Sequence, residues 1–92
     1  MRLLLDTHAF LWFVWADPQL SQTAKSSLET ADNELFLSAA SHWEIAIKIS
    51  TGKLSVGQDL EAFLAEHLDR NRIVMLPIYR TFGKGIDASV SP

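Results

Sequence analysis

Short apolar runs alternate with helical segments along most of the chain. Three apolar runs, at residues 2–5, 34–38 and 73–76, are long enough only for buried strands. Helical character is found in the remaining segments, at residues 8–16, 21–30, 38–50 and 59–70. Strands that are separated by helices pair in parallel through right-handed crossovers. The pattern therefore predicts an α/β fold with a three-stranded parallel sheet flanked by helices.

Two of these helical segments differ in how their apolar residues are distributed. The segment at 38–50 is apolar on nearly every side, so we expect it to be largely buried. The segment at 59–70 starts with Asp59 as its cap and carries its apolar residues on one face. Lys48 and Lys53 are expected to form a solvated helix end, which is favourable at the negative pole of the helix dipole.

Residues 79–92 show neither a helical nor a strand period. Glycine, serine and proline in this stretch favour coil. We therefore place a domain at residues 1–78 and an irregular tail at residues 79–92. The α/β pattern stops at the third strand, so we expect the C-terminal part of the fold to be incomplete.

The composition narrows the classes of function. With 92 residues, 48% of them hydrophobic, the chain suits one globular domain. Its net charge of −3 argues against nucleic-acid binding through bulk charge, so such binding needs a specific device. The absence of cysteine removes disulfides and thiolate metal sites. Asp6 and His8 interrupt the N-terminal apolar run, and no run approaches the roughly 20 apolar residues of a membrane span, so we expect a cytoplasmic protein.

Two carboxylates stand where chemistry is possible. Asp6 follows the first strand, and ligands gather at the carboxyl ends of parallel strands, although an Asp before a helix is also a favoured N-cap. Glu44 fits a capping box that starts at Ser41. However, Ser38 is an equally good cap, and it would place Glu44 inside an apolar helix, where a carboxylate needs a cation, a metal or hydrogen-bond donors. The pattern alone leaves both alternatives open.

Two longer stretches carry a resemblance to a known family. They are RLLLDTHAFLWFVWADPQLS at residues 2–21 and LSAASHWEIAIKISTGKLSV at residues 37–56. With the strand ending MLPI at residues 75–78, they resemble PIN-domain proteins, and more closely the VapC-like toxin ribonucleases of bacterial toxin–antitoxin pairs. The resemblance covers about the first 78 residues and rests on the paired motifs LLLDTH and SxWEIAIK.

The resemblance implies a fold and a function. It implies an α/β sandwich whose clustered acidic residues hold Mg²⁺ or Mn²⁺ and cut RNA. Asp6 and Glu44 match metal-binding acidic residues of the family, and Thr7 and Ser41 match its supporting polar neighbours. Oxygen ligands of this kind suit hard divalent cations, which activate water and stabilise the leaving oxygen of a phosphodiester. A cognate antitoxin and a second copy of the chain are the protein partners that we expect.

The sequence also departs from the family pattern. After the LPI strand the family usually continues to a DPFDR-like segment with further acidic ligands, and this sequence has no such segment. Asp87 lacks the flanking pattern, so we do not equate it with a catalytic residue. We therefore expect a truncated member that binds metal weakly and has little or no ribonuclease activity by itself. The alternative is an inactive PIN fragment that acts as a dimerisation or antitoxin-binding module, in which Trp12, Phe13 and Trp15 pack in the core or form the contact surface.

Overall fold

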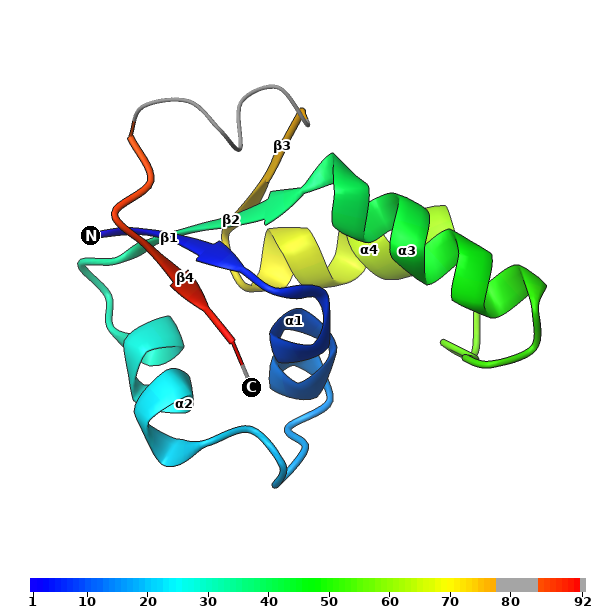
Figure 1. The fold of residues 1–92 in the computed structure, drawn as a ribbon, viewed down its shortest axis with the longest axis horizontal. Coiled ribbons are helices and arrows are strands. Elements are labelled where there is room, and N and C mark those ends of the chain that lie inside the picture. Colours follow the sequence, from blue (N-terminus) through cyan, green and yellow to red (C-terminus); the bar gives the residue numbers. More distant parts are fainter. Residues whose placement is uncertain (78–84, 92) are drawn as a thin grey trace.

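The computed structural model of the chain describes residues 1–77 and 85–91. The strands within them are β1 (Arg2–Leu5), β2 (Glu34–Ser38), β3 (Ile73–Leu76) and β4 (Ala88–Val90). The helices are α1 (Thr7–Val14), α2 (Gln22–Glu29), α3 (Ala39–Ser50) and α4 (Leu60–Arg70). All strand pairs are parallel, in the order β3-β2-β1-β4 (Figure 1). The predicted α/β class is confirmed.

The core lies between the sheet and the helices that cover it. Figure 1 shows α1 and α2 below the strands. Leu5 of β1 and Leu37 of β2 are register partners, and both are almost completely buried. Phe10 of α1 and Phe63 of α4 are also buried, and their rings meet edge to face with centroids 6.4 Å apart. Burial of these large side chains is the main favourable term for so small a domain.

Side-chain caps define where α2 and α4 begin. The Ser21 hydroxyl accepts a hydrogen bond from the Ala24 N–H at 3.1 Å, and the Asp59 carboxylate accepts one from the Ala62 N–H at 3.0 Å. Each bond satisfies an N–H group that the first helical turn leaves free. Both caps were predicted from the sequence, and the helices α2 and α4 start directly after them.

The expected irregular tail contains a fourth strand, so that prediction is wrong for residues 88–90. β4 pairs in parallel with β1, with Leu3 opposite Ala88 and Leu5 opposite Val90. The pairing begins at Asp87, whose N–H donates to the Arg2 carbonyl at 2.8 Å. Within the described residues, the sheet therefore has four strands and not three. Of the other residues of the expected tail, 79–84 and 92 lie outside the described residues.

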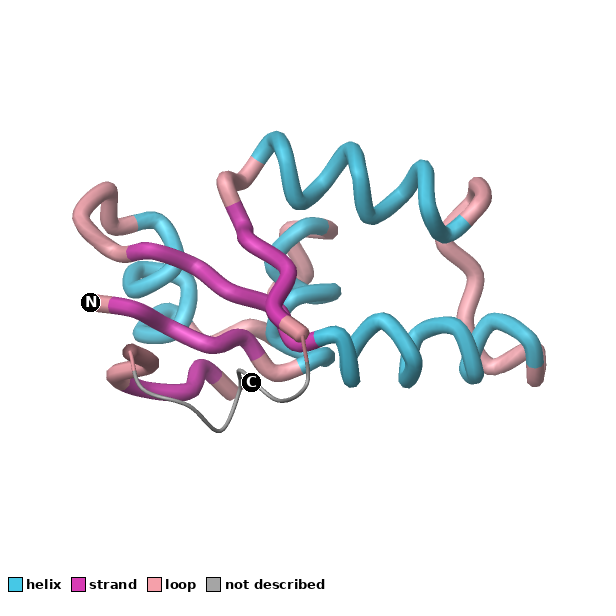
Figure 2. The backbone as a smooth tube through the Cα atoms, turned by 90° about the horizontal axis from the view of Figure 1, so that it is seen from above, coloured by secondary structure: helices cyan, strands magenta, loops and turns pink. Residues whose placement is uncertain are grey.

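The expectation that α3 is largely buried is also wrong. Ser41 and Ile45 of α3 are buried, whereas the Trp43 and Ile47 side chains are 68% and 60% exposed. Figure 2 shows the reason, because α3 and α4 extend beyond the strands and leave the outer side of α3 uncovered. An exposed apolar pair on this helix offers a contact surface that the domain itself does not use. No helix in the described part of the chain is long and apolar enough to span a membrane.

Candidate functional site

The carboxyl ends of the strands form a hollow at one edge of the sheet. Parallel pairing brings Leu5, Leu37 and Val90 into register, so the residues that follow them meet at the same edge. A hollow of about 340 Å³ opens there. It is lined by Leu4, Leu5, Asp6, Ser38, Ser41, Ser89 and Ser91. Two of the predicted site residues, Asp6 and Ser41, thus face one cavity, in the position where open parallel sheets bind ligands.

Asp6 occupies the N-cap position of α1, but its carboxylate does not cap the helix. Its backbone N–H donates to the Val90 carbonyl at 2.8 Å, and its carbonyl accepts from the Phe10 N–H at 2.9 Å. Its side chain makes no capping hydrogen bond and is exposed. In the part of the chain that the structure describes, this carboxylate has no hydrogen-bond or ion-pair partner. The capping alternative for Asp6 is therefore not realised, and the carboxylate is available to a ligand.

Glu44 lies inside α3, so the capping-box alternative is wrong. The helix begins at Ala39 and is capped by the Ser38 hydroxyl, which accepts from the Ala40 N–H at 3.0 Å. Ser41 is then a helical residue and not the cap. Glu44 Oε1 lies 3.1 Å from the hydroxyl of Thr7, the residue that follows Asp6. Thr7 thus contacts both Ser41 and Glu44 of α3, and Asp6 lines the hollow together with Ser41.

Thr7 links the start of α1 to α3. Its buried hydroxyl lies 2.7 Å from the buried Ser41 hydroxyl as well as 3.1 Å from Glu44 Oε1. A carboxylate can only accept, so one consistent pattern has Thr7 donating to Glu44 and accepting from Ser41. The arrangement satisfies both hydroxyl groups and orients the Glu44 carboxylate.

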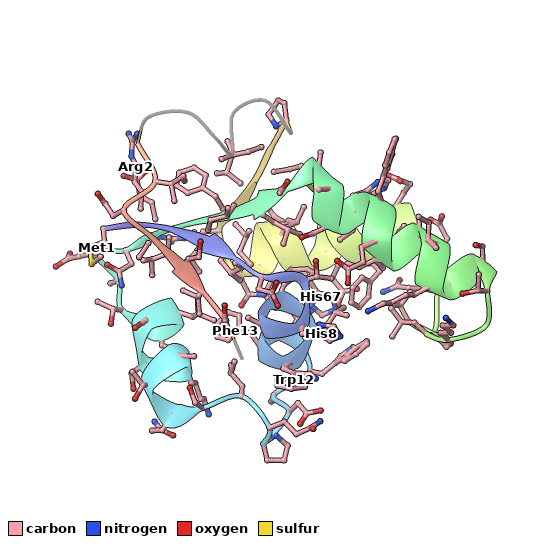
Figure 3. All side chains as sticks on the ribbon, viewed as in Figure 1. Met1, Arg2, His8, Trp12, Phe13 and His67 are labelled. Carbon is pink, nitrogen blue, oxygen red and sulfur yellow. The ribbon has the colours of Figure 1, made fainter. Side chains whose placement is uncertain are left out.

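Lys48 and His8 complete the contacts around Glu44. Lys48 Nζ lies 3.1 Å from Glu44 Oε2 and 3.3 Å from His8 Nε2. The hydrogen bond from Lys48 lowers the pKa of Glu44 below its ordinary value, burial opposes this shift, and the Thr7 hydrogen bond adds to it. Figure 3 shows His8 and Trp12 projecting from the same side of α1, and their ring centroids are 6.1 Å apart. The lowered pKa keeps the Glu44 carboxylate charged at neutral pH.

The donor set matches a hard divalent cation in kind. Asp6 and Glu44 supply carboxylate oxygens, and Mg²⁺ is commonly held by one or two carboxylates, with water and substrate phosphate completing its shell. In residues 1–77 and 85–91, no group of three or more His, Cys, Asp or Glu side chains is arranged to hold a metal ion. Asp6 and Glu44 are therefore of the right chemical kind for a divalent cation, and two carboxylates alone would bind it weakly.

Comparison with known families decides the identity. The family model of the PIN domain matches residues 3–87. The chain belongs to the PIN-domain family. No curated protein and no solved structure matches it. Membership of this family implies a nuclease-type function in general terms, and PIN domains are generally dependent on divalent metal.

Lys48 lies in the last turn of α3, as the sequence predicts, and its side chain is 30% exposed. In this PIN domain it also forms an ion pair with Glu44, which the helix-end prediction did not include. The signal was present, because Glu44 and Lys48 are four residues apart and such pairs face one another on a helix. His8 carried no comparable signal, since its contact with Lys48 joins residues that are 40 positions apart.

Proposed function

We propose that this PIN domain is of the metal-dependent, VapC-like toxin endoribonuclease type, with Asp6 and Glu44 as its metal ligands, and that this chain by itself has little or no activity. One observation carries the proposal. The exposed Asp6 carboxylate has no partner among the described residues. Asp6 directly precedes Thr7, whose hydroxyl is hydrogen-bonded to the Glu44 carboxylate. A structural role would have engaged Asp6 in capping α1.

The chemistry follows from the residues. Bound Mg²⁺ or Mn²⁺ supplies an activated water and charge stabilisation for the leaving oxygen of a phosphodiester. Asp6 offers its free carboxylate to the ion, and Glu44 remains ionised through its hydrogen bond with Lys48. Thr7 and Ser41 orient Glu44 and are supporting residues. The cation also offsets the repulsion between this acidic edge and the phosphates of RNA.

A metal titration tests the proposed ligands. We expect Mn²⁺ to bind the purified chain weakly, and Asp6→Asn and Glu44→Gln each to weaken binding about tenfold or more, since each removes one of two charged ligands. Asp69→Asn is the matched control because it removes an exposed carboxylate from α4, away from the site. Equal Mn²⁺ affinity for the wild type and all three variants would contradict the proposed site.

An RNA assay tests the reaction. We expect little or no cleavage of labelled single-stranded RNA, because the DPFDR-like segment with the family's further acidic ligands is not in this sequence. Any cleavage should disappear with a chelator and with Asp6→Asn. Rapid cleavage that is abolished by a chelator and by Asp6→Asn would show that two carboxylates suffice for activity. Cleavage that survives Asp6→Asn would exclude the proposed site.

The proposal includes protein partners, namely a second copy of the chain and a cognate antitoxin. The exposed side chains of Trp43 and Ile47 support a protein contact on the outer face of α3. Sedimentation of the chain at increasing concentration tests self-association, and Trp43→Ser should reduce it. An inactive dimerisation or antitoxin-binding module would self-associate without binding Mn²⁺ at Asp6 and Glu44, so the titration separates this alternative from the nuclease.

A further inference from the structure

Lys48 differs from the other residues at the proposed site because it carries a positive charge. Its Nζ lies 3.1 Å from Glu44 Oε2, and its side chain is 30% exposed. The same nitrogen lies 3.3 Å from His8 Nε2. An ammonium group can only donate hydrogen bonds, so His8 Nε2 is the acceptor in this contact. These two contacts hold the ammonium between α3 and α1, beside the proposed metal ligands.

The two oxygens of Glu44 have partners of different kinds. Oε1 is bonded to the neutral hydroxyl of Thr7, which orients the carboxylate without competing with a cation. Oε2 is bonded to the charged ammonium of Lys48. A divalent cation ligated by Oε2 would need the place of that ammonium, and the two positive charges would repel each other. Lys48 is therefore an internal cation that would compete with a metal ion ligated by Glu44 Oε2.

We propose that Lys48 is a positioning residue that occupies Glu44 until a divalent cation replaces it, and that the released ammonium then binds a phosphate of the RNA. The inference rests on the proposed function and extends it to the substrate. Lys48 remains tethered to α3 by a long flexible side chain, so after leaving Oε2 it stays close to the site. While it is paired with Glu44, its charge is neutralised and attracts phosphate weakly.

The first consequence is a change in metal affinity. Lys48→Met keeps the apolar stem and the helix propensity and removes the charge. We expect Mn²⁺ to bind this variant about 3- to 10-fold more tightly than the wild type, since a competing cation and its repulsion are gone. A merely structural role for Lys48 predicts the opposite, namely weaker binding together with a disordered Glu44.

The second consequence is a coupling between metal and RNA. Without divalent ions, Lys48→Met should lower the affinity for a labelled single-stranded oligoribonucleotide only about two- to threefold, because the variant loses one net positive charge but no direct phosphate contact. With Ca²⁺ present, the wild type should gain affinity and the variant should gain about 3- to 10-fold less. Fluorescence anisotropy measures both affinities, and a denaturing gel confirms that the RNA is intact.

Two variants serve as controls. Lys53→Met removes the same charge from an exposed residue shortly beyond the end of α3, and it should behave as the wild type in both titrations. Lys48→Arg keeps the charge and should keep most of the metal-dependent gain in RNA affinity. Thermal unfolding of each variant shows whether the fold is retained. If Lys48→Met does not fold, Lys48→Gln is compared with the wild type in its place.

The outcomes separate this inference from the proposed function. Unchanged or weaker Mn²⁺ binding by Lys48→Met, or an equal Ca²⁺-dependent gain in RNA affinity for Lys48→Met and wild type, would overturn the role of Lys48. If Glu44→Gln still weakens Mn²⁺ binding in that case, the proposed metal site stands. Absence of Mn²⁺ binding by the wild type would overturn both.

Discussion

The two ends of the sheet use acidic residues in opposite ways. At the amino end, Asp87 Oδ2 accepts a hydrogen bond from the Arg2 N–H at 2.7 Å, and the Asp87 N–H donates to the Arg2 carbonyl. Arg2 Nε also lies 3.6 Å from Glu34 Oε1. At the carboxyl end, the Asp6 carboxylate has no partner within the described residues, and Glu44 is oriented by one hydroxyl and one ammonium.

Structural and functional carboxylates of this small domain differ in what their side chains contact. Asp87 joins β4 to β1, so its interactions contribute to folding. Asp6 contributes its backbone to the sheet and to α1, while its side chain contributes nothing to either. An acidic residue whose backbone is fixed and whose side chain is unused is available for chemistry. The comparison leads to three predictions.

The largest effect on stability is expected at Thr7. Thr7→Val keeps the shape and removes the hydroxyl, so the buried Ser41 hydroxyl and Glu44 lose their shared partner. We expect the free energy of unfolding to fall by about 2 kcal/mol, the cost of an unsatisfied buried polar group. Urea denaturation followed by circular dichroism measures the change.

A double-mutant cycle identifies the cause. Ser41→Ala leaves Thr7 bonded to Glu44 and should cost less than Thr7→Val. The double variant should lose clearly less stability than the sum of the single losses, because the two side chains share one interaction. Additive losses, or a loss below about 0.5 kcal/mol for Thr7→Val, would mean that this link does not hold α1 against α3.

The next effect compares the two aspartates directly. Asp87→Ala removes the acceptor for the Arg2 N–H and should lower the free energy of unfolding by about 1 kcal/mol, since water replaces part of this exposed bond. Asp6→Ala should change it by less than about 0.5 kcal/mol, although an N-cap Asp ordinarily contributes more. The same urea titration applied to both variants checks the difference. A larger loss in the free energy of unfolding for Asp6→Ala than for Asp87→Ala would mean that Asp6, and not Asp87, is the structural carboxylate.

The smallest effect concerns the pH dependence of the Glu44–Lys48 pair. The pKa of Glu44 is lowered, first of all by its hydrogen bond with Lys48, so the charged form stabilises the fold. This contribution is present above the ordinary value of 4.5 and is lost as the pH falls through the lowered pKa. Because the Glu44 side chain is 44% exposed, solvent screening limits the contribution to less than about 0.5 kcal/mol.

Two measurements check the sign and the cause. Carbon NMR titration of the Glu44 carboxyl should give a midpoint below 4.5 in the wild type, and Lys48→Met should move it upward. The stability difference between wild type and Glu44→Gln should be greatest at neutral pH and should shrink in acid. A midpoint that does not respond to Lys48→Met would show that the ion pair is not the cause.

Helices and strands could be predicted from the sequence where the pattern that marks them joins residues close together in the chain. Ser21 and Asp59 mark helix starts because a capping hydrogen bond joins residues only three positions apart. Strand β4 was missed because a strand of three residues has too short a pattern to recognise, and its pairing with β1 joins opposite ends of the chain. The contact between His8 and Lys48 was missed for the same reason.

The pattern of the amino-acid sequence was sufficient for the α/β class and for the helix starts at Ser21 and Asp59, because these signals lie within short segments. The paired motifs around Asp6 and Glu44 supplied the candidate site residues. The tertiary structure alone decided which polar groups have partners. The cap at Ser38 excluded the capping box at Glu44, and the way α3 extends beyond the sheet left Trp43 exposed. The use of a side chain depends on contacts between distant segments, which a linear pattern does not contain.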